Sequence, residues 1–200
     1  YKTNFVPTYI QNLDNKLIQG GLLIASRFSF LARTVHYHKT IKELVLYDGN
    51  NKANTRFYSY IIADITTPEN TFTIATTHLP DTTSGEADEF QAQCTDKLLS
   101  LLNTETPHLI CGDFNMPRGY NSLYELITKQ YKDNIPNTYK SSLDKNLHRR
   151  GNDPEINRPI FDIYMVDYIF TKQEYQVTDV RLEFGVSDHA AIVSQVSKNS

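Results

Sequence analysis

The sequence predicts a mixed α/β fold in one domain, with many strands and few helices. Residues 56–65 are apolar on both faces and rich in β-formers, which is typical of a strand covered on both sides. Apolar residues between positions 90 and 102 recur at helical spacing instead. The 200 residues are 40% hydrophobic and 22% charged, enough for one sizeable core and too few for two comfortable domains. We therefore expect residues 1–200 to form a single domain.

Further strands are expected where short apolar runs are bounded by turn residues. These runs cover residues 21–26, 43–47, 71–77, 108–112, 163–171, 175–184 and 191–196. Residues 1–19 are polar and Asn-rich, and we find no strong strand pattern in them.

Two helices are expected. The first covers residues 86–102, with Thr83 and Glu86 as a capping box and an apolar face that packs on a sheet. The second is shorter and follows Asn121 or Ser122, either of which is a suitable capping residue.

The run from Leu109 to Pro117 brings two polar residues to the end of a predicted strand. Asp113 and Asn115 are two positions apart, so alternation places them on the same side. A carboxylate beside a carboxamide can orient a water and hold a phosphate oxygen. The alternative is an Asx-type turn in which both side chains serve local backbone hydrogen bonds.

Further polar residues also stand beside apolar runs. They are His78, Asp167 and the pair Asp188-His189. A carboxylate inside an apolar strand is costly without a partner, and a histidine would serve, so Asp167 predicts an Asp–His pair. The alternatives are a rim histidine at position 78, a capping or salt-bridged carboxylate at 167, and a polar loop end at 188–189.

Together these motifs resemble those of the endonuclease/exonuclease/phosphatase family, the superfamily of pancreatic-type deoxyribonuclease and exonuclease III. The motifs are Thr-Thr-His78-Leu-Pro, Gly112-Asp-Phe-Asn, Val166-Asp-Tyr-Ile-Phe and Ser187-Asp-His, preceded by Gly21-Leu-Leu-Ile-Ala-Ser-Arg-Phe. Five short motifs in the family's order form a specific signal. The resemblance implies a deoxyribonuclease I-like fold, a four-layer sandwich of two packed mixed β-sheets flanked by helices.

This sequence departs from the family's pattern at several positions. The family carries an asparagine and a metal-binding glutamate on strands that precede the Ser-Arg-Phe element, and this chain begins too late to contain them. We interpret residues 1–200 as an N-terminally shortened family domain. Ser29 stands where the family often has proline, and acidic residues follow the His78 motif where a basic one is common.

The resemblance implies a metal-dependent phosphoester hydrolase that cleaves phosphodiester bonds. Asp113 and Asn115 would orient or deprotonate the water, and His189, held by Asp167, would contact the phosphate or shuttle a proton. His78 would act as a second acid or as a phosphate donor.

Substrate and metal contacts are also implied. Arg27 would be a structural or phosphate-side residue at the rim, alongside the substrate contacts of Asn115 and His78. Asp188, with the upstream glutamate, would ligate Mg²⁺, with Mn²⁺ as an alternative.

A nuclease acting on DNA or RNA is our first interpretation of the substrate. The alternatives are a phospholipid or sugar-phosphate phosphodiesterase or phosphatase, and a non-catalytic phosphate-binding module. The net charge of −3 argues against a broad nucleic-acid clamp. A polar stretch offers either a local basic rim or an ordinary solvated loop, and its cations are Lys145, His148, Arg149, Arg150 and Arg158.

The remaining observations concern context. No apolar stretch is long enough for a transmembrane segment, and no obligate protein partner is indicated. Cys94 and Cys111 have no metal-site or disulfide spacing and are expected to be small core residues. They favour a reducing compartment such as the cytoplasm, while an exported protein without a disulfide is an open alternative.

Overall fold

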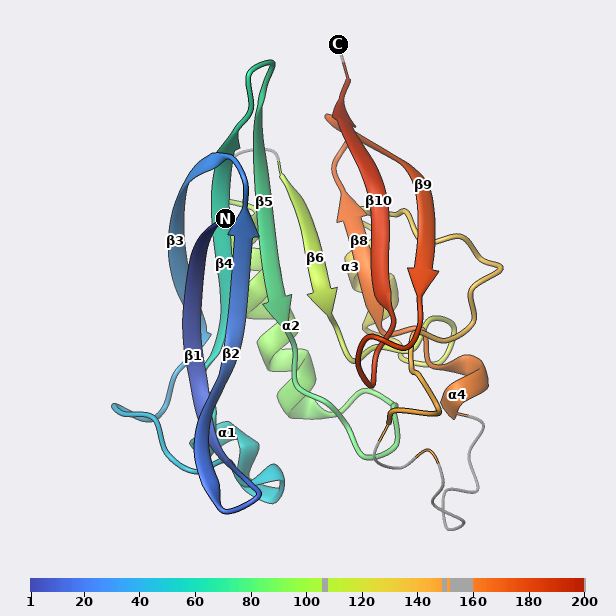
Figure 1. The fold of residues 1–200 in the computed structure, drawn as a ribbon. Coiled ribbons are helices and arrows are strands. Elements are labelled where there is room, and N and C mark those ends of the chain that lie inside the picture. Colours follow the sequence, from blue (N-terminus) through green and yellow to red (C-terminus); the bar gives the residue numbers. More distant parts are fainter. Residues whose placement is uncertain (106–107, 149–150, 152–159, 200) are drawn as a thin grey trace.

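The computed structural model describes residues 1–105, 108–148, 151 and 160–199. Its centre is a six-stranded mixed sheet in the order β3-β4-β5-β6-β8-β7 (Figure 1). The strands are β3 (Ser29–His38), β4 (Tyr58–Thr66), β5 (Thr71–His78), β6 (Leu109–Asp113), β8 (Asp167–Thr171) and β7 (Lys132–Asp133). The β5–β6 pair is parallel and the other neighbours are antiparallel.

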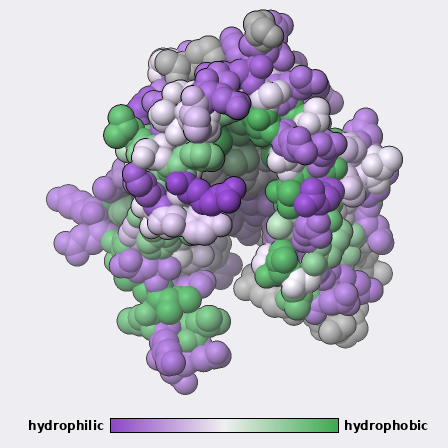
Figure 2. Space-filling view, turned by 45° about the horizontal axis from the view of Figure 1, so that its top comes forward, coloured by the Kyte–Doolittle hydropathy of each residue, from purple (hydrophilic) through white to green (hydrophobic). Residues whose placement is uncertain are grey.

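Two antiparallel strand pairs lie on one face of this sheet. They are β1 (Lys2–Leu13) with β2 (Lys16–Ser26), and β9 (Tyr175–Glu183) with β10 (Ala191–Lys198). Figure 1 shows the first pair in front of β3 and β4 and the second in front of β8. Figure 2 shows the surface hollowed between these two parts. The predicted mixed α/β, deoxyribonuclease I-like class is confirmed, and in the described residues the second sheet consists of two separate pairs.

Helices cover the opposite face of the central sheet. The main one, α2 (Glu89–Leu102), lies behind β4 to β6, and α3 (Tyr124–Thr128) lies behind β8 (Figure 1). The other helical segments are single turns: η1 (Gly49–Asn51), α1 (Lys52–Thr55) and α4 (Ile160–Ile163). In the described part of the chain, no helix has the length and apolarity needed to cross a bilayer.

The start of α2 differs from the prediction. The side chain of Asp88 accepts a hydrogen bond from the backbone N–H of Gln91 at 2.7 Å and caps the helix. The first helical residue is therefore Glu89, and Thr83 and Glu86 precede the helix instead of capping it. Asp88 is an equally good capping residue, and its position just before the apolar face decides the start.

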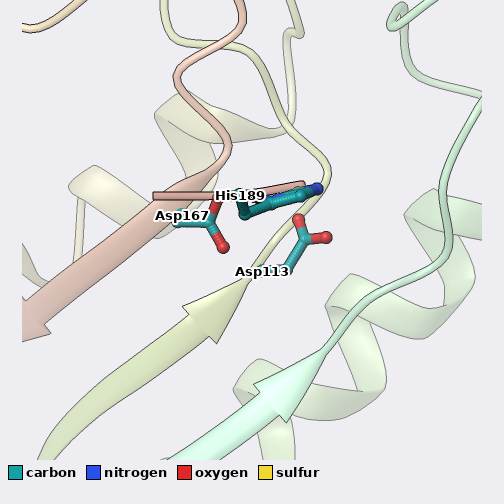
Figure 3. A group of neighbouring side chains, drawn as sticks. All are labelled: Asp113, Asp167 and His189. Atoms are coloured by element: carbon teal, nitrogen blue, oxygen red, sulfur yellow. Dashed lines mark hydrogen bonds and ion pairs between the residues drawn. The ribbon is translucent and has the colours of Figure 1, made fainter. Parts of the chain in front are cut away.

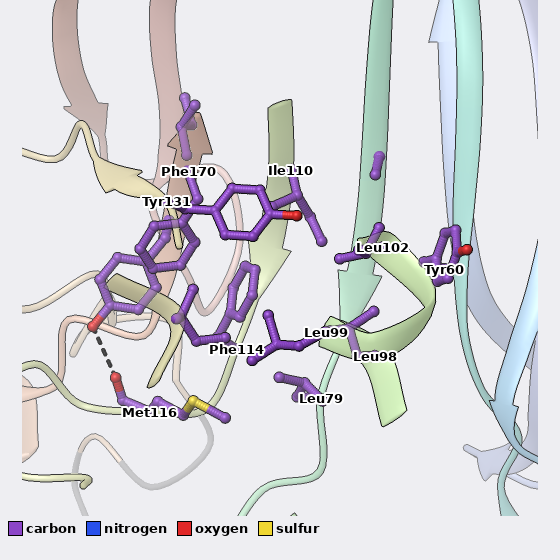
Figure 4. Packing of buried hydrophobic residues seen from close by; sticks show 14 of the residues in the cluster. Tyr60, Leu79, Leu98, Leu99, Leu102, Ile110, Phe114, Met116, Tyr131 and Phe170 are labelled. Atoms are coloured by element: carbon purple, nitrogen blue, oxygen red, sulfur yellow. Dashed lines mark hydrogen bonds between the residues drawn. The ribbon is translucent and has the colours of Figure 1, made fainter. Parts of the chain in front are cut away.

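The main core lies between the central sheet and α2. Leu98 and Leu102 of α2 are buried against Ile110 of β6, and Phe114 and Phe170 pack edge to face at 4.9 Å (Figure 4). Truncating one such leucine to alanine typically costs about 2–5 kcal/mol. This core fixes β5, β6 and β8 relative to one another, and these strands carry the candidate site.

The strand predictions were wrong for three segments, and β3 (Ser29–His38) forms where no strand was expected. Residues 1–19, expected to lack strand structure, form β1 and the start of β2, joined by a turn at Asp14 and Asn15 with positive φ. Most side chains of β1 are exposed or half-buried, so its sequence shows only a weak alternation of polar and apolar residues. The strand expected over 43–47 is a single bridge from Leu46 to Ile10. The strand expected over 163–171 begins only at Asp167, because residues 160–163 are helical.

Candidate active site

Three of the expected site residues form a row across adjacent strands. In the strand register His78 at the end of β5 pairs with Asp113 at the end of β6, and Asp113 pairs with Asp167 at the start of β8. Paired residues point to the same face of a sheet, so backbone hydrogen bonds bring these side chains together. His78 Nε2 lies 3.5 Å from Asp113 Oδ2.

The backbone near the end of β6 is shaped by a glycine. Gly112 has a φ of +145°, and a Cβ there would lie 2.0 Å from the carbonyl oxygen of Thr77. A side chain would therefore push β6 away from β5 at the level of the site. This is why the Gly-Asp order of the motif matters for the placement of Asp113.

Asn115 lies beside Asp113 and is held by the main chain. Its backbone N–H donates to Asp113 Oδ1 at 2.8 Å, its Nδ2 donates to the carbonyl of Leu79 at 2.9 Å, and its φ is +52°. The Asx-type turn considered from the sequence is thus present. It orients the Asp113 carboxylate, so the turn and the candidate site occupy the same residues.

His189 reaches this row from the turn that precedes β10. Its Nδ1 lies 2.7 Å from Asp167 Oδ2, and its backbone forms an isolated bridge with Leu143. Figure 3 shows the imidazole lying over the carboxylates of Asp113 and Asp167. The structure therefore contains the Asp–His pair that the buried position of Asp167 predicted.

Ser142 is a member of this group that sequence reasoning missed. Its fully buried hydroxyl donates to Asp167 Oδ2 at 2.7 Å and accepts from the backbone N–H groups of Val166 and Asp167, both at 3.2 Å. One carboxylate oxygen of Asp167 thus receives both Ser142 and His189. A serine within a polar stretch gives no sequence signal, because only the folded loop places it under Asp167.

The charges in the row shift the proton affinities of its members. Burial, followed by the negative charge of Asp167, raises the pKa of Asp113 to about 7. Burial alone would lower the pKa of His189, but its hydrogen bond to Asp167 and the carboxylates of Asp167, Asp113 and Asp188 raise the pKa to about 9. Near neutral pH, these shifts favour the imidazolium form of His189 and leave Asp113 close to the midpoint of its titration.

His78 has the opposite tendency. Burial, followed by the positive charges of Arg56 and His189, lowers its pKa well below the usual value. A neutral imidazole is expected at this position near pH 7. Arg56 is a second residue near the site that the sequence analysis did not single out.

The donor set fits a hard divalent cation. Ligand-type atoms of Asp113, Asp167 and His189 lie within 4.8 Å of one another, and carboxylate oxygens are the ligands that Mg²⁺ prefers. Asp188, the expected metal ligand, is not in this group. It is exposed and directly precedes His189 in the sequence. Its charge nevertheless contributes to the raised pKa of His189.

Arg27 is not brought into the group. It lies exposed in the turn between β2 and β3, and the first residue of β3, Ser29, pairs with Thr66 at the far end of β4. His78 lies at the other end of the same sheet, since Thr77 pairs with Tyr60. The antiparallel path of the chain therefore separates Arg27 from the row.

Two further predictions concern thiols and the basic stretch. Burial raises the pKa of the free thiols, to about 12 for Cys94 and about 11 for Cys111, so neither is poised as a nucleophile. Of the basic stretch, Lys145 is exposed and His148 packs edge to face on Phe161. Arg149, Arg150 and Arg158 lie outside the described residues.

The sequence matches the model of the Endonuclease/Exonuclease/phosphatase family over residues 3–189. Proteins of this class are in general hydrolases of phosphoester bonds and typically depend on a divalent metal. The chain belongs to the endonuclease/exonuclease/phosphatase family. A comparison with curated protein sequences gives no significant match.

Solved structures share the fold at low sequence identity. An endonuclease/exonuclease/phosphatase from Beutenbergia cavernae aligns with a TM-score of 0.67 and 15% identity over 98% of this chain and 53% of its own. The human Nocturnin catalytic domain, solved with a bound sulfate anion, gives 0.63 and 18% over 99% and 72%. Beta toxin from Staphylococcus aureus gives 0.56 and 15% over 89% and 68%. The chain thus spans about half the length of the first of these proteins.

Proposed function

We propose that this protein is a metal-dependent phosphodiesterase and that its substrate is DNA or RNA. The observation that carries the proposal is the row of His78, Asp113 and Asp167 at the ends of three neighbouring strands of the central sheet. His189 and Asn115 complete this group. Membership of a family of phosphoester hydrolases supports the class of reaction.

The roles follow from charge and geometry. Asp113, with a pKa of about 7, is suited to take a proton from the attacking water, and Asn115 fixes its carboxylate. His189 as an imidazolium is suited to hold a phosphoryl oxygen and to supply a proton to the leaving alkoxide. Neutral His78 offers a hydrogen bond from the β5 side of the row.

Mg²⁺, or Mn²⁺ as the alternative, fits beside these residues. The carboxylates of Asp113 and Asp167 would hold it, and the ion would supply positive charge to the phosphoryl oxygens. Asp188, the ligand that the family resemblance implies, lies outside this group and would have to approach the ion from the turn before β10. Asp167 would also orient the imidazole of His189, and the hydrogen bond between Asp167 Oδ2 and His189 Nδ1 supports this role.

A phospholipid substrate is the second candidate, and one observation favours it. Leu13 and Leu17, at the tip of the β1–β2 hairpin, are 55% and 71% exposed. An exposed apolar hairpin is the feature expected of an enzyme that works at a lipid surface. A sugar-phosphate substrate and a non-catalytic phosphate-binding role are two further candidates.

A substrate panel tests the proposal. Purified chain is assayed on single- and double-stranded DNA, RNA, sphingomyelin and phosphoinositides, with Mg²⁺, with Mn²⁺ and with chelator. We expect metal-dependent cleavage of a nucleic acid that is lost in Asp113→Asn. Cleavage of lipid alone would select the second candidate, and phosphate binding without turnover on any substrate would select the binding module.

A further inference from the structure

The turn between β9 and β10, residues 184–190, carries His189 and has little apolar packing of its own. The ladder between the two strands ends at the pair Glu183–Ala191, and residues 183–188 are all exposed. The large apolar side chains of this turn, Phe184 and Val186, are 53% and 62% exposed. Apolar burial therefore does not fix the turn, and its position depends on polar contacts with the rest of the chain.

Asp144 supplies such contacts from the facing loop. Only 4% of this residue is exposed. Its Oδ2 accepts a hydrogen bond from the backbone N–H of Gly185 at 2.7 Å, and its own backbone N–H donates to the carbonyl of Asp188 at 2.9 Å. One buried residue thus contacts both the beginning and the end of the turn.

The same carboxylate also organises the loop to which it belongs. Its Oδ1 accepts from the backbone N–H of Asn146 at 2.9 Å, which closes an Asx-type turn, and the Asp144 carbonyl accepts from the N–H groups of Leu147 and His148. The hydrogen bonds from Gly185 and Asn146 lower the pKa of Asp144. The side chain is therefore a carboxylate near neutral pH, and both of these contacts are charge-assisted hydrogen bonds.

The loop that contains Asp144 contacts both members of the Asp–His pair. The backbone of His189 forms a bridge with Leu143, which lies between Ser142 and Asp144. The hydroxyl of Ser142 donates to the carboxylate of Asp167, the partner of His189. Residues 142–144 therefore hold Asp167 on one side and the turn that carries His189 on the other.

We propose that Asp144 is a positioning residue of this site and that its carboxylate, by holding Gly185, keeps the imidazole of His189 against Asp167. The inference rests on the proposed function, because it gives Asp144 a part in the reaction through His189. Asp144 acts on the geometry of His189 and not on the substrate itself. An imidazole that is already in place avoids an ordering cost when the reaction occurs.

The first test removes the contact to Gly185 and keeps the local turn. In Asp144→Ser the hydroxyl can still accept from the N–H of Asn146 in the corresponding ST-turn, but the shorter side chain has no second oxygen for Gly185. We expect ¹⁵N relaxation to give backbone order parameters for Gly185 and His189 of about 0.85 in the wild type and below about 0.6 in the variant, with those of β5 and β6 unchanged.

Two further measurements follow His189 itself. Its Nδ1–H, protected by the hydrogen bond to Asp167, is expected as a downfield proton resonance in the wild type and to broaden or disappear in Asp144→Ser. On the substrate that the panel identifies, we expect kcat to fall about tenfold or more with KM within about twofold, because the lost contact held a group that acts in the transition state.

Asp48→Ser is the matched control. The side chain of Asp48 accepts from the backbone N–H of Asn50 at 2.9 Å, the same two-residue spacing as in the turn of Asp144, and the residue is exposed at the start of η1. This variant is expected to keep the wild-type order parameters, Nδ1–H resonance and turnover. Thermal melts verify that each variant is folded.

Asp144→Asn replaces Asp144→Ser if the serine variant does not fold. The amide has nearly the shape of the carboxylate but only one oxygen, and the local turn to Asn146 is expected to keep that oxygen. Its NH₂ group then faces the N–H of Gly185, so the contact to the His189 turn is lost in this variant as well.

The outcomes distinguish this inference from the proposed function. A folded Asp144 variant with the wild-type order parameters in the turn, or with an unchanged Nδ1–H resonance, would overturn the inference even if the substrate panel shows hydrolysis. A lower melting temperature with an unchanged resonance would identify a merely structural carboxylate. Loss of the resonance in the variant of a chain that cleaves nothing would leave the positioning of His189 standing and reject the enzyme.

Discussion

Asp113 of β6 and Asp167 of β8 occupy directly opposed positions in an antiparallel ladder. Two carboxylates so placed repel each other, and like charges in opposed positions destabilise a sheet. The structure compensates through His189 and Ser142, both of which hydrogen-bond to Asp167 Oδ2. The same repulsion contributes to the raised pKa of Asp113. The destabilising contact is therefore also a source of the pKa on which the proposed role of Asp113 as a base depends.

Loss of either acid–base residue is expected to abolish most turnover. Asp113→Asn and His189→Ala remove groups at the end of strands, so neither opens a large cavity. General acid–base groups typically contribute about 10²–10⁴-fold to rate, and we expect losses in that range with melting temperatures near wild type. Steady-state kinetics and thermal melts check this. Near wild-type turnover in either variant would refute the assigned roles.

Asp167→Asn separates orientation from structure. The amide still hydrogen-bonds but favours the wrong imidazole tautomer and removes the charge that raises the pKa of His189. We expect kcat to fall strongly with little change in KM, and the alkaline limb of the pH–rate profile to move to lower pH. A lower melting temperature with unchanged activity per folded molecule would instead indicate a structural carboxylate.

Ser142→Ala tests the buried hydroxyl under Asp167. The change leaves two backbone N–H groups and one carboxylate oxygen short of a partner, at a cost of about 1–3 kcal/mol in the free energy of unfolding. Denaturant unfolding measures this, with Ser100→Ala on the exposed side of α2 as the control. Equal stability of the two variants would show that the hydroxyl is not needed.

The stability of the metal-free chain is expected to fall as pH rises. His189 has a folded pKa of about 9 against an ordinary value of 6.5, so its stabilising contribution is complete below pH 6.5 and is lost as pH rises through 9. Asp113, raised from 3.8 to about 7, acts in the same direction between those values. Unfolding in chelating buffer at pH 6, 7.5 and 9 measures the decline.

His189→Gln is the matched variant for that measurement. It removes the group that titrates between pH 6.5 and 9, and we expect the decline over that range to become shallower by on the order of 1–3 kcal/mol. Parallel curves for wild type and variant would contradict the raised pKa of His189.

Much of the site was predictable because its residues stand at the ends of apolar strands. Local patterns placed His78, Asp113 and Asp167 beside apolar strands, and the family resemblance implied that they share one site; the register that aligns them is seen only in the structure. Arg27, which the resemblance placed at the rim of the site, lies away from the row of His78, Asp113 and Asp167. Its position depends on where the turn between β2 and β3 lies along the sheet.

Two features of the site depended on long-range contacts that local patterns do not record. Ser142 reaches Asp167 across 25 positions of the sequence, and the ring of Tyr9 in β1 lies over the buried Arg56. The strand at residues 2–13 was missed for a related reason. Its side chains are mostly half-buried, so the alternation of polar and apolar residues that marks a strand is weak there.

His78, Asp113 and Asp167 are fixed by one continuous ladder, whereas His189 is attached beside Ser142 by few main-chain bonds, from Ala190 to Ser142 and from Asp144 to Asp188. Amide hydrogen exchange therefore divides the site: protection in β5 and β6 reports global unfolding, and protection at Ala190 and Asp144 reports a local opening of lower free energy. On heating, we expect this turn to open before the sheet melts. If the proposed activity depends on His189, inactivation and unfolding would then be separate events.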